Sequence, residues 1–314
     1  MVKRRIAYFF IAPAVIATML LVFYPLVNGI YLSFTNADKF NSAKLIGGKF
    51  TPSSYELQCN IDSNKDELVP PISCLRNYIN IFEDERYYFW QVFGQTLIWT
   101  IANIIPHILL GLGLALLLNR NIRYRAVYRV ALILPWAVPS YISAFVWKFL
   151  YNSEYGFINN FFGTDINWFA DPTTAMIAVV IANTWLAVPF NMVTMLGGLQ
   201  SIPGDLYEAA EVDGANWRQK FTGITLPMLR PVMMTAVLLG VIWTFNSFNV
   251  IFLVSEGDPS RQTEILATWA WRLGRDQEQY GISAAYSAII LALLLFFSFV
   301  YIRVLSRPGQ ESAL

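Results

Sequence analysis

The chain has 314 residues, of which 56% are hydrophobic and only 14% are charged. Soluble domains carry about 25% charged residues, so this composition excludes a disordered chain and an ordinary soluble enzyme and indicates an integral membrane protein. A net charge of +1 gives no reason to expect nucleic acid as a partner. One histidine and two cysteines are too few for a His/Cys metal cluster within one chain, so no metal site is expected.

Six stretches without charged side chains predict six membrane-spanning helices. A helix needs about 20 apolar residues to cross the hydrocarbon core of a bilayer. An isolated charge at the bilayer centre costs about 2.5–3.5 kcal/mol, which explains why these stretches lack Lys, Arg, Asp and Glu. The predicted spans lie near residues 6–32, 90–118, 129–151, 174–199, 229–254 and 280–304.

The distribution of basic residues predicts the orientation of the chain. Lys and Arg side chains stand before the first span, between the second and third, between the fourth and fifth, and after the sixth. Basic residues favour the cytoplasmic side, so both termini are predicted to be cytoplasmic. The predicted organisation is a cytoplasmic start with the first span (1–32), an extracytoplasmic segment (33–89), a core (90–305) and a cytoplasmic tail (306–314).

The extracytoplasmic segment contains both cysteines, Cys59 and Cys74, in an insertion that covers 37–74. On the oxidising side of a membrane, two cysteines can form a disulfide that closes a short loop. Two unpaired thiols in a loosely ordered insertion are the alternative.

Several predicted spans carry polar side chains, which hydrocarbon disfavours unless they find partners. Two interpretations stay open: hydrogen bonds between helices, or a polar path through the helical bundle. A structural histidine bonded to a neighbouring carbonyl is expected in preference to a proton relay, because the spans contain no acidic residue. The residues concerned are Asn103, His107, Asn183, Asn191, Asn246 and Asn249.

The fifth predicted span combines amides with an aromatic ring. Asn246 and Asn249 are three residues apart and would share one face of a continuous helix, with Phe245 beside Asn249. Such a face suits a sugar, because amides bond hydroxyl groups and rings stack on the apolar sugar face. The alternative is a packed aromatic face with two structural amides.

The connection between the fourth and fifth spans is predicted to fold into two short helices. Asp205 can cap the first, with Glu208 completing a capping box, and Gly214 would end it. Asn216, with Gln219 in the matching position, can cap the second. Apolar side chains among the charges favour docking into a protein groove, and two helices lying on the membrane surface are the alternative.

The same connection carries a spaced pattern of residues: Glu208-Ala209-Ala210, Gly214, Ile224 and Leu226-Pro227. This pattern resembles the EAA motif of ABC importer permeases. The wider chain is similar to the carbohydrate-uptake branch, the maltose-permease-like subunits. The supporting residues are Leu32-Ser33-Phe34-Thr35-Asn36, Asn77-Tyr78, and Pro203 with Asp205-Leu206-Tyr207.

The resemblance implies an all-α integral membrane protein with six transmembrane helices and a type I ABC importer permease fold. It implies a permease subunit of an ATP-driven importer of an oligosaccharide or glycoside, in the bacterial cytoplasmic (inner) membrane, without enzymatic activity of its own. The loop at 203–227 would be the coupling helix that docks on an ATPase subunit. The residues implied in coupling are Glu208, Ala209, Ala210, Asp213, Gly214, Leu226 and Pro227.

The implied partners are a second homologous permease, two ATPase subunits, an extracytoplasmic solute-binding protein, a sugar and the lipid bilayer. The chain lacks a G-x-x-x-x-G-K-[ST] phosphate loop, so ATP and Mg²⁺ are expected on the ATPase subunits and no cofactor is expected in this chain. An ion-gradient-driven secondary transporter and a membrane enzyme are the alternatives. The spans lack the acidic residues of the first and the nucleophile–base or metal constellation of the second.

In maltose-type permeases the ligand lies in mid-membrane, against the spans on either side of the EAA loop. The stretch Trp185–Phe190 resembles a W-L-G-Y-P-Y segment there, with Ala187 in place of glycine and Val188 and Phe190 in place of tyrosines. Two hydroxyl groups are thus absent, which argues against a site identical to that for maltose. A site for a related glycoside or a smaller oligosaccharide and a pocket that lies mainly in the partner permease are both open. The implied substrate pathway contains Leu186, Ala187, Phe190, Asn191, Phe245, Asn246 and Asn249.

Overall fold

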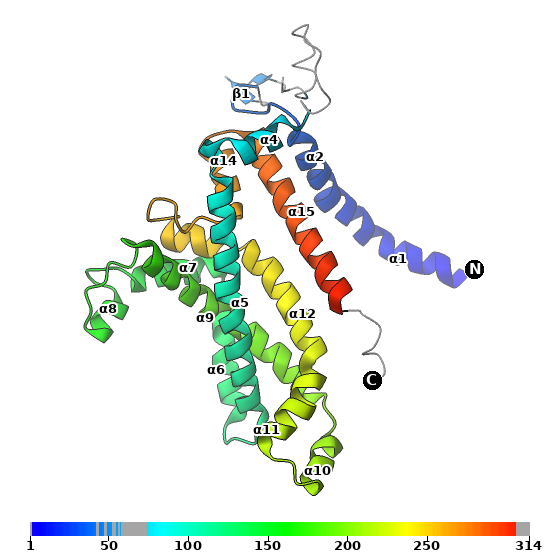
Figure 1. Ribbon diagram of the computed structural model, residues 1–314. Coiled ribbons are helices and arrows are strands. Elements are labelled where there is room, and N and C mark those ends of the chain that lie inside the picture. Colours follow the sequence, from blue (N-terminus) through cyan, green and yellow to red (C-terminus); the bar gives the residue numbers. More distant parts are fainter. Residues whose placement is uncertain are drawn as a thin grey trace. The chain divides into compact units, whose positions relative to one another are not determined.

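The computed structural model describes residues 2–41, 44–46, 49–51, 55, 57 and 74–305 (Figure 1). The chain divides into two compact units. The first contains Met1–Trp90 and Trp269–Arg303, and the second contains Gln91–Thr268 and Val304–Leu314.

The first unit is mainly helical. A small antiparallel hairpin in the 33–89 segment pairs Lys44 with Thr51 and Ile46 with Lys49, an addition to the predicted all-α class. The elements are α1 (Val2–Thr18), a π-helical turn (Met19–Phe23), α2 (Tyr24–Leu32), β1 (Lys44–Ile46), β2 (Lys49–Thr51), α4 (Arg76–Glu83), a 3-10 turn (Glu85–Tyr87) and α15 (Tyr280–Leu305).

A hydrogen-bonded junction in the first unit joins residues that are far apart in the sequence. The amide nitrogen of Asn77 donates to the backbone oxygens of Ser33 (2.9 Å) and Thr35 (2.8 Å). The hydroxyl groups of Ser33 and Tyr78 lie 2.6 Å apart. A Cβ on Gly281 would lie 2.3 Å from the Thr35 oxygen, so this close approach requires glycine. Residues that support the family resemblance therefore hold α4 against the end of α2.

The second unit is helical throughout its assigned elements. They are α5 (Phe89–Asn119), α6 (Arg125–Ala137), α7 (Ser140–Leu150), α8 (Phe157–Phe162), α9 (Pro172–Gln200), α10 (Gly204–Val212), α11 (Trp217–Lys220), a π-helical turn (Phe221–Thr225), α12 (Leu226–Phe245), α13 (Phe248–Val250), a π-helical turn (Ile251–Ser255) and α14 (Leu266–Arg275), of which α5 begins and α14 ends in the first unit.

Among the described residues, five helices are long and apolar enough to span a membrane, and a sixth span arises if α6 and α7 count as one bent pair. The third predicted span, near 129–151, corresponds to this bent pair, in which α6 and α7 meet at 93°. Val138 is extended at the break (φ −81°, ψ 130°). The residue before a proline is disfavoured in the helical region, so Pro139 accounts for this corner.

The fifth predicted span is also interrupted. A helix runs from Trp217 to Phe245, ends at Asn246–Ser247 and resumes at Phe248. The expectation that Asn246 and Asn249 share one face of a continuous helix is therefore wrong. Asn and Ser side chains hydrogen-bond nearby backbone groups and compete with helix formation.

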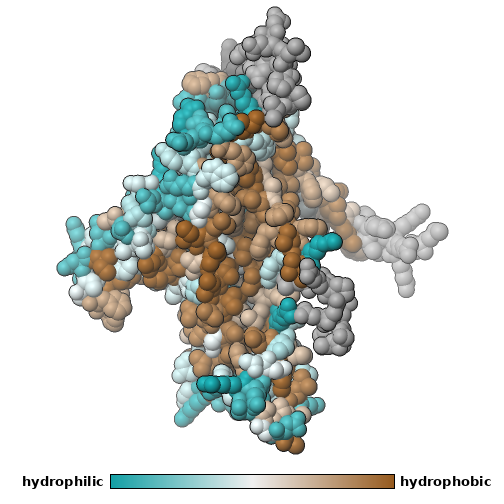
Figure 2. All heavy atoms as spheres, in the orientation of Figure 1, coloured by the Kyte–Doolittle hydropathy of each residue, from teal (hydrophilic) through white to brown (hydrophobic). Residues whose placement is uncertain are grey.

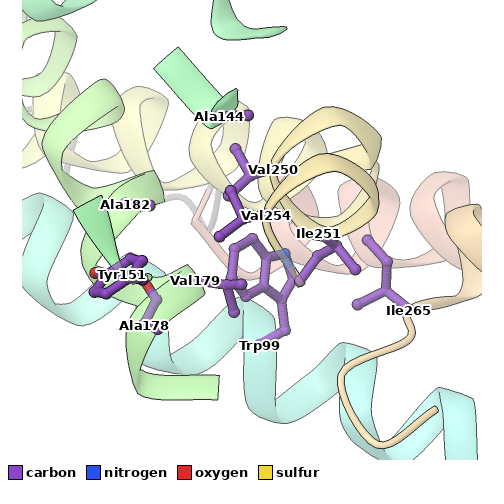
Figure 3. Packing of buried hydrophobic residues seen from close by; sticks show 10 residues of the cluster. All are labelled: Trp99, Ala144, Tyr151, Ala178, Val179, Ala182, Val250, Ile251, Val254 and Ile265. Carbon is purple, nitrogen blue, oxygen red and sulfur yellow. The ribbon is translucent and has the colours of Figure 1, made fainter. Parts of the chain in front are cut away.

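A buried cluster supports this interruption (Figure 3). Trp99 of α5 lies among side chains from α7, α9 and the 250–254 segment, including Val179 and Ile251. Its indole nitrogen donates to the backbone oxygen of Thr244 at 2.8 Å. The last carbonyls of a helix lack intrahelical donors, so Trp99 satisfies a group that the end of α12 leaves open.

We expect Trp99→Phe to lower the free energy of unfolding by about 1–3 kcal/mol, because it removes this buried donor. Thermal unfolding of the purified protein in detergent measures the effect. Trp90→Phe is the matched control, since Trp90 is 66% exposed and its indole bond to the Phe82 oxygen is 3.3 Å long. Equal unfolding midpoints for the two variants would contradict the stabilising role of Trp99.

The helix α5 exposes an apolar surface along its length. In Figure 2, hydrophobic residues cover its visible face, and hydrophilic residues are more frequent near α10 and α11. Soluble monomers rarely expose an apolar surface that follows a whole helix, so this surface requires lipid or another protein chain. The exposed apolar residues of α5 include Leu97, Ile98, Ile101, Ile105, Leu109, Leu110 and Leu117.

Candidate functional site: a cavity in the second unit and the 203–227 loop

A cavity of about 360 Å³ lies within the second unit. Its walls come from α5, α6, α7, α9, α12 and the interrupted segment after α12. The size falls within the range of small-molecule sites. The lining residues are His107, Trp136, Ser140, Asn183, Leu186, Ala187, Phe190, Asn191, Gly240, Trp243, Thr244, Asn246, Ser247, Phe248, Asn249 and Val250.

Most of the predicted pathway residues meet at this cavity. From α9 they are Leu186, Ala187, Phe190 and Asn191, and from the interrupted segment they are Asn246 and Asn249. Phe245 is the exception: it is buried and does not belong to the lining. The expected pairing of Phe245 with Asn249 relied on the continuous helix, which the structure does not contain.

Three aromatic rings form a row on the cavity wall. The ring centroids of Trp136 and Phe190 are 6.3 Å apart, and those of Phe190 and Trp243 are 4.9 Å apart. Of these three rings, only Phe190 was predicted from the sequence to line the substrate pathway. The rings supply the apolar surface that had been assigned to Phe245.

The cavity amides are anchored through their nitrogens. The Nδ2 atom of Asn249 donates to the Ser140 hydroxyl at 2.8 Å, and that of Asn191 donates to the Ala187 oxygen at 3.1 Å. Asn246 makes a longer bond, 3.4 Å, to the Ile242 oxygen. The amide oxygens therefore remain to accept hydrogen bonds from a ligand.

A second set of polar residues connects helices. The Asn183 amide donates to the Asn103 oxygen at 2.8 Å, and the Asn103 amide donates to the Trp99 oxygen at 2.8 Å. The Ser247 hydroxyl donates to the Asn183 oxygen at 3.5 Å. Asn103 joins helices and lies outside the cavity lining, Asn183 and Asn249 bond other helices and also line the cavity, and Asn191 and Asn246 line the cavity with bonds inside their own segment.

His107 differs from its expected role. Its side chain is 2% exposed, it belongs to the cavity lining, and its Nε2 atom has no hydrogen-bond partner. The expected bond to a neighbouring carbonyl is absent among the described residues. No Asp, Glu, Lys or Arg stands in the described lining, so His107 is its one ionisable side chain apart from the very weakly acidic hydroxyl groups.

The first helix of the 203–227 loop ends as predicted at Gly214. The glycine has φ +74°, its N–H donates to the Glu211 oxygen at 3.0 Å, and the N–H of Ala215 donates to the Ala210 oxygen at 2.8 Å. These two bonds form the helix-terminating arrangement that favours glycine.

The predicted cap at the start of this helix is wrong. Pro203 occupies the cap position without a side-chain hydrogen bond, and Asp205 lies in the first turn. Its carboxylate is still favourable there because it faces the positive end of the helix dipole. The capping box of Asn216 and Gln219 is confirmed by bonds of 3.0 and 2.7 Å. That second helix continues through a π-helical turn into α12 instead of forming a separate short helix.

Side chains of the 203–227 loop divide into anchored and free groups. The hydroxyl groups of Tyr207 and Thr225 lie 2.9 Å apart. Lys220 bonds Glu211 at 2.6 Å and holds the pKa of that carboxyl below its usual range. Glu208 is exposed and makes no ion pair with the part of the chain that the structure describes.

The other predicted loop residues lie close by. Ala209 and Asp213 are exposed, Ala210 is half-buried, and Leu226 and Pro227 are exposed at the start of α12. The described loop therefore combines an internally bonded frame with an outward set of mixed polar and apolar side chains.

The structure describes one of the two cysteines of the predicted disulfide. Cys74 is a disulfide-bonded residue that lies two positions before the start of α4 at Arg76. Cys59 lies outside the described residues, so the pairing of Cys59 with Cys74 stays a prediction.

Comparison with known proteins gives relatives along the whole chain. The family described as binding-protein-dependent transport system inner membrane component matches residues 107–308. A probable ABC transporter permease protein of Brucella suis is 31% identical over 317 residues, which is 99% of this chain and 100% of that protein. The trehalose/maltose transport system permease protein MalF of Thermococcus litoralis is 37% identical over 241 residues, or 74% of this chain and 80% of that protein.

Solved structures share the fold at lower identity. A chain of a bacterial alginate ABC transporter, solved with an alginate pentasaccharide-bound periplasmic protein, has a TM-score of 0.76 and 19% identity, covering 98% of this chain and 97% of that chain. A chain of the inward-facing MetNI methionine ABC transporter has a TM-score of 0.52 and 20% identity, covering 71% and 96%.

Proposed function

We infer the function from the family to which the chain belongs, that of the binding-protein-dependent transport system inner membrane components. It is a multi-pass inner-membrane permease subunit with the type I ABC importer fold. We propose that it forms half of the pathway through which an ATP-driven importer moves an uncharged oligosaccharide or glycoside.

The observation that carries this proposal is the composition of the cavity. It combines a row of aromatic rings with amide oxygens, which suits the apolar face and the hydroxyl groups of a sugar. A charged substrate would need a compensating charge on leaving water, and the described lining offers no carboxylate, Lys or Arg. The names of two relatives, from Thermococcus litoralis and Bacillus subtilis, refer to trehalose/maltose and galactooligosaccharides.

The cavity is open on one side. Trp136 is 60% exposed and Trp243 is 53% exposed, and both amides of the interrupted segment are exposed. An open wall of aromatic and polar groups is incomplete as a binding site. We propose that a second, homologous permease subunit covers it.

The 203–227 loop is the proposed contact with the ATPase. Glu211 has its partner within the chain, whereas Glu208 and the 89% exposed side chain of Val212 are available to another protein. We propose that two ATPase subunits bind ATP and Mg²⁺, that the loop and both termini are cytoplasmic, and that an extracytoplasmic binding protein delivers the sugar. None of the relatives reported above is described as a gradient-driven transporter.

Affinity purification of the tagged chain from its own membranes tests the assembly. We expect an ATPase and a second permease to copurify in stoichiometric amounts, and the binding protein to join when sugar is present. A chain that emerges alone under mild detergent and still catalyses uptake would contradict the proposal.

We expect Asn249→Ala to reduce sugar uptake about tenfold without loss of assembly, since one good hydrogen bond corresponds to about 1–1.5 kcal/mol. The variant removes the amide oxygen and frees Ser140. Asn160→Ala is the matched control, because Asn160 is exposed on α8 and outside the cavity lining. Uptake at the control's rate across a sugar panel would move the binding site elsewhere.

A further inference from the structure

Within the described lining of the cavity, one buried polar atom has no hydrogen-bond partner among the described residues. His107 of α5 is 2% exposed, stands in the lining, and has an unpartnered Nε2 atom. Buried polar atoms almost always have hydrogen-bond partners, so an exception needs an explanation. A ligand in the cavity provides one.

Contacts on both sides fix the position of His107. One helical turn before it, Asn103 accepts a hydrogen bond from Asn183 of α9. One turn after it, a Cβ on Gly111 of α5 would lie only 2.6 Å from the Cβ of Asn191, which also belongs to α9. Because α5 and α9 are in contact one turn before and one turn after His107, the imidazole has a defined place on the cavity wall. Preorganised groups of this kind determine ligand orientation.

The surrounding chemistry narrows the choice of partner. A proton relay needs further titratable groups, and apart from hydroxyl groups the described lining offers none besides His107. A metal ion needs several ligands of the His, Cys or carboxylate type, which this lining also does not contain. A hydroxyl group both donates and accepts hydrogen bonds, so it pairs with an imidazole nitrogen in either tautomer.

We propose that the imidazole of His107 bonds one hydroxyl group of the transported sugar and thereby determines which sugars pass. This inference rests on the proposed function and adds a specificity residue to it. The neighbouring rings of Phe190 and Trp243 hold the apolar face of the sugar, and His107 selects the hydroxyl pattern. A site built to bond a hydroxyl group rejects an analogue without it far better than an apolar wall does.

The test uses the assembled importer reconstituted in vesicles, with a labelled neutral sugar that the wild type transports and its monodeoxy analogues. We expect the wild type to prefer the parent sugar over one of the analogues by about tenfold. In His107→Phe, uptake of the parent should fall to the level of that analogue and the preference should disappear. In His107→Gln, whose amide also donates and accepts, part of the preference should return.

Thr100→Val is the matched control. Thr100 is buried on the same helix, bonds the Thr96 oxygen and lies outside the cavity lining, so its preference among analogues should equal that of the wild type. An unchanged preference in His107→Phe, or in His107→Gln and His107→Ala where the Phe variant fails to assemble, would overturn the inference. Failure of the proposed function would be distinguishable, since the wild type itself would then transport no sugar.

Discussion

Gly214→Val is expected to abolish sugar uptake while the protein still inserts into the membrane. Gly214 has φ +74°, and a β-branched side chain is strongly disfavoured in that region. The two backbone bonds that end α10 depend on this conformation. Losing them changes the angle between α10 and the helix that begins at Trp217, and the proposed contact with the ATPase is then lost.

Gly163→Val separates coupling from backbone strain. Gly163 has φ +64° at the end of α8, and a Cβ there would meet nothing within 4 Å. Both variants therefore carry similar strain of about 1–2 kcal/mol, but only one lies in the 203–227 loop. Uptake and sugar-stimulated ATP hydrolysis should fall at least tenfold in Gly214→Val and stay near wild type in Gly163→Val. Equal losses in both variants would remove the coupling role.

Gly111→Ala is expected to destabilise the protein and impair transport together. The added Cβ would lie 2.6 Å from the Cβ of Asn191 and 3.1 Å from its carbonyl carbon, so α5 and α9 must separate. Overpacking of this kind costs about 1–3 kcal/mol. Because Asn191 lies on the cavity wall, the same displacement alters the proposed sugar site.

Gly113→Ala on the same helix should have the opposite effect and raise the stability of the protein. A Cβ on Gly113 meets nothing within 4 Å, and replacing glycine by alanine in a helix stabilises it by about 0.5–1 kcal/mol. Thermal unfolding of both variants in one detergent provides the comparison. A lowered midpoint in Gly113→Ala, or an unchanged one in Gly111→Ala, would contradict the close contact of α5 with α9.

Long uninterrupted spans could be predicted closely from the sequence. The prediction of 90–118 agrees with α5 (Phe89–Asn119), and that of 174–199 agrees with α9 (Pro172–Gln200). Hydrocarbon excludes charge, so charge-free length is a direct signal of such helices. Hydropathy carries no information on backbone continuity. The breaks at Pro139 and Asn246 depend on local backbone chemistry and on Trp99, a partner 145 residues from Thr244.

The residues of the candidate site also fall into those that local sequence identifies and those that depend on the packing of distant segments. Residues of α9 and the interrupted segment were found because a local stretch resembles a known family. His107, Trp136 and Trp243 were not assigned to the site, because they lie far apart in the sequence. Only the packing of α5, α6 and α12 brings them to one cavity. The orphaned nitrogen of His107 in particular cannot be recognised from a sequence, because it depends on which neighbours fail to reach it.

The decisive experiment is sugar uptake by the reconstituted assembly under controlled energy supply. Assignment of the chain to an ATP-driven importer predicts uptake that requires ATP and the binding protein and that persists when ionophores collapse all ion gradients. Uptake by this chain alone, driven by an ion gradient and indifferent to ATP, would contradict it.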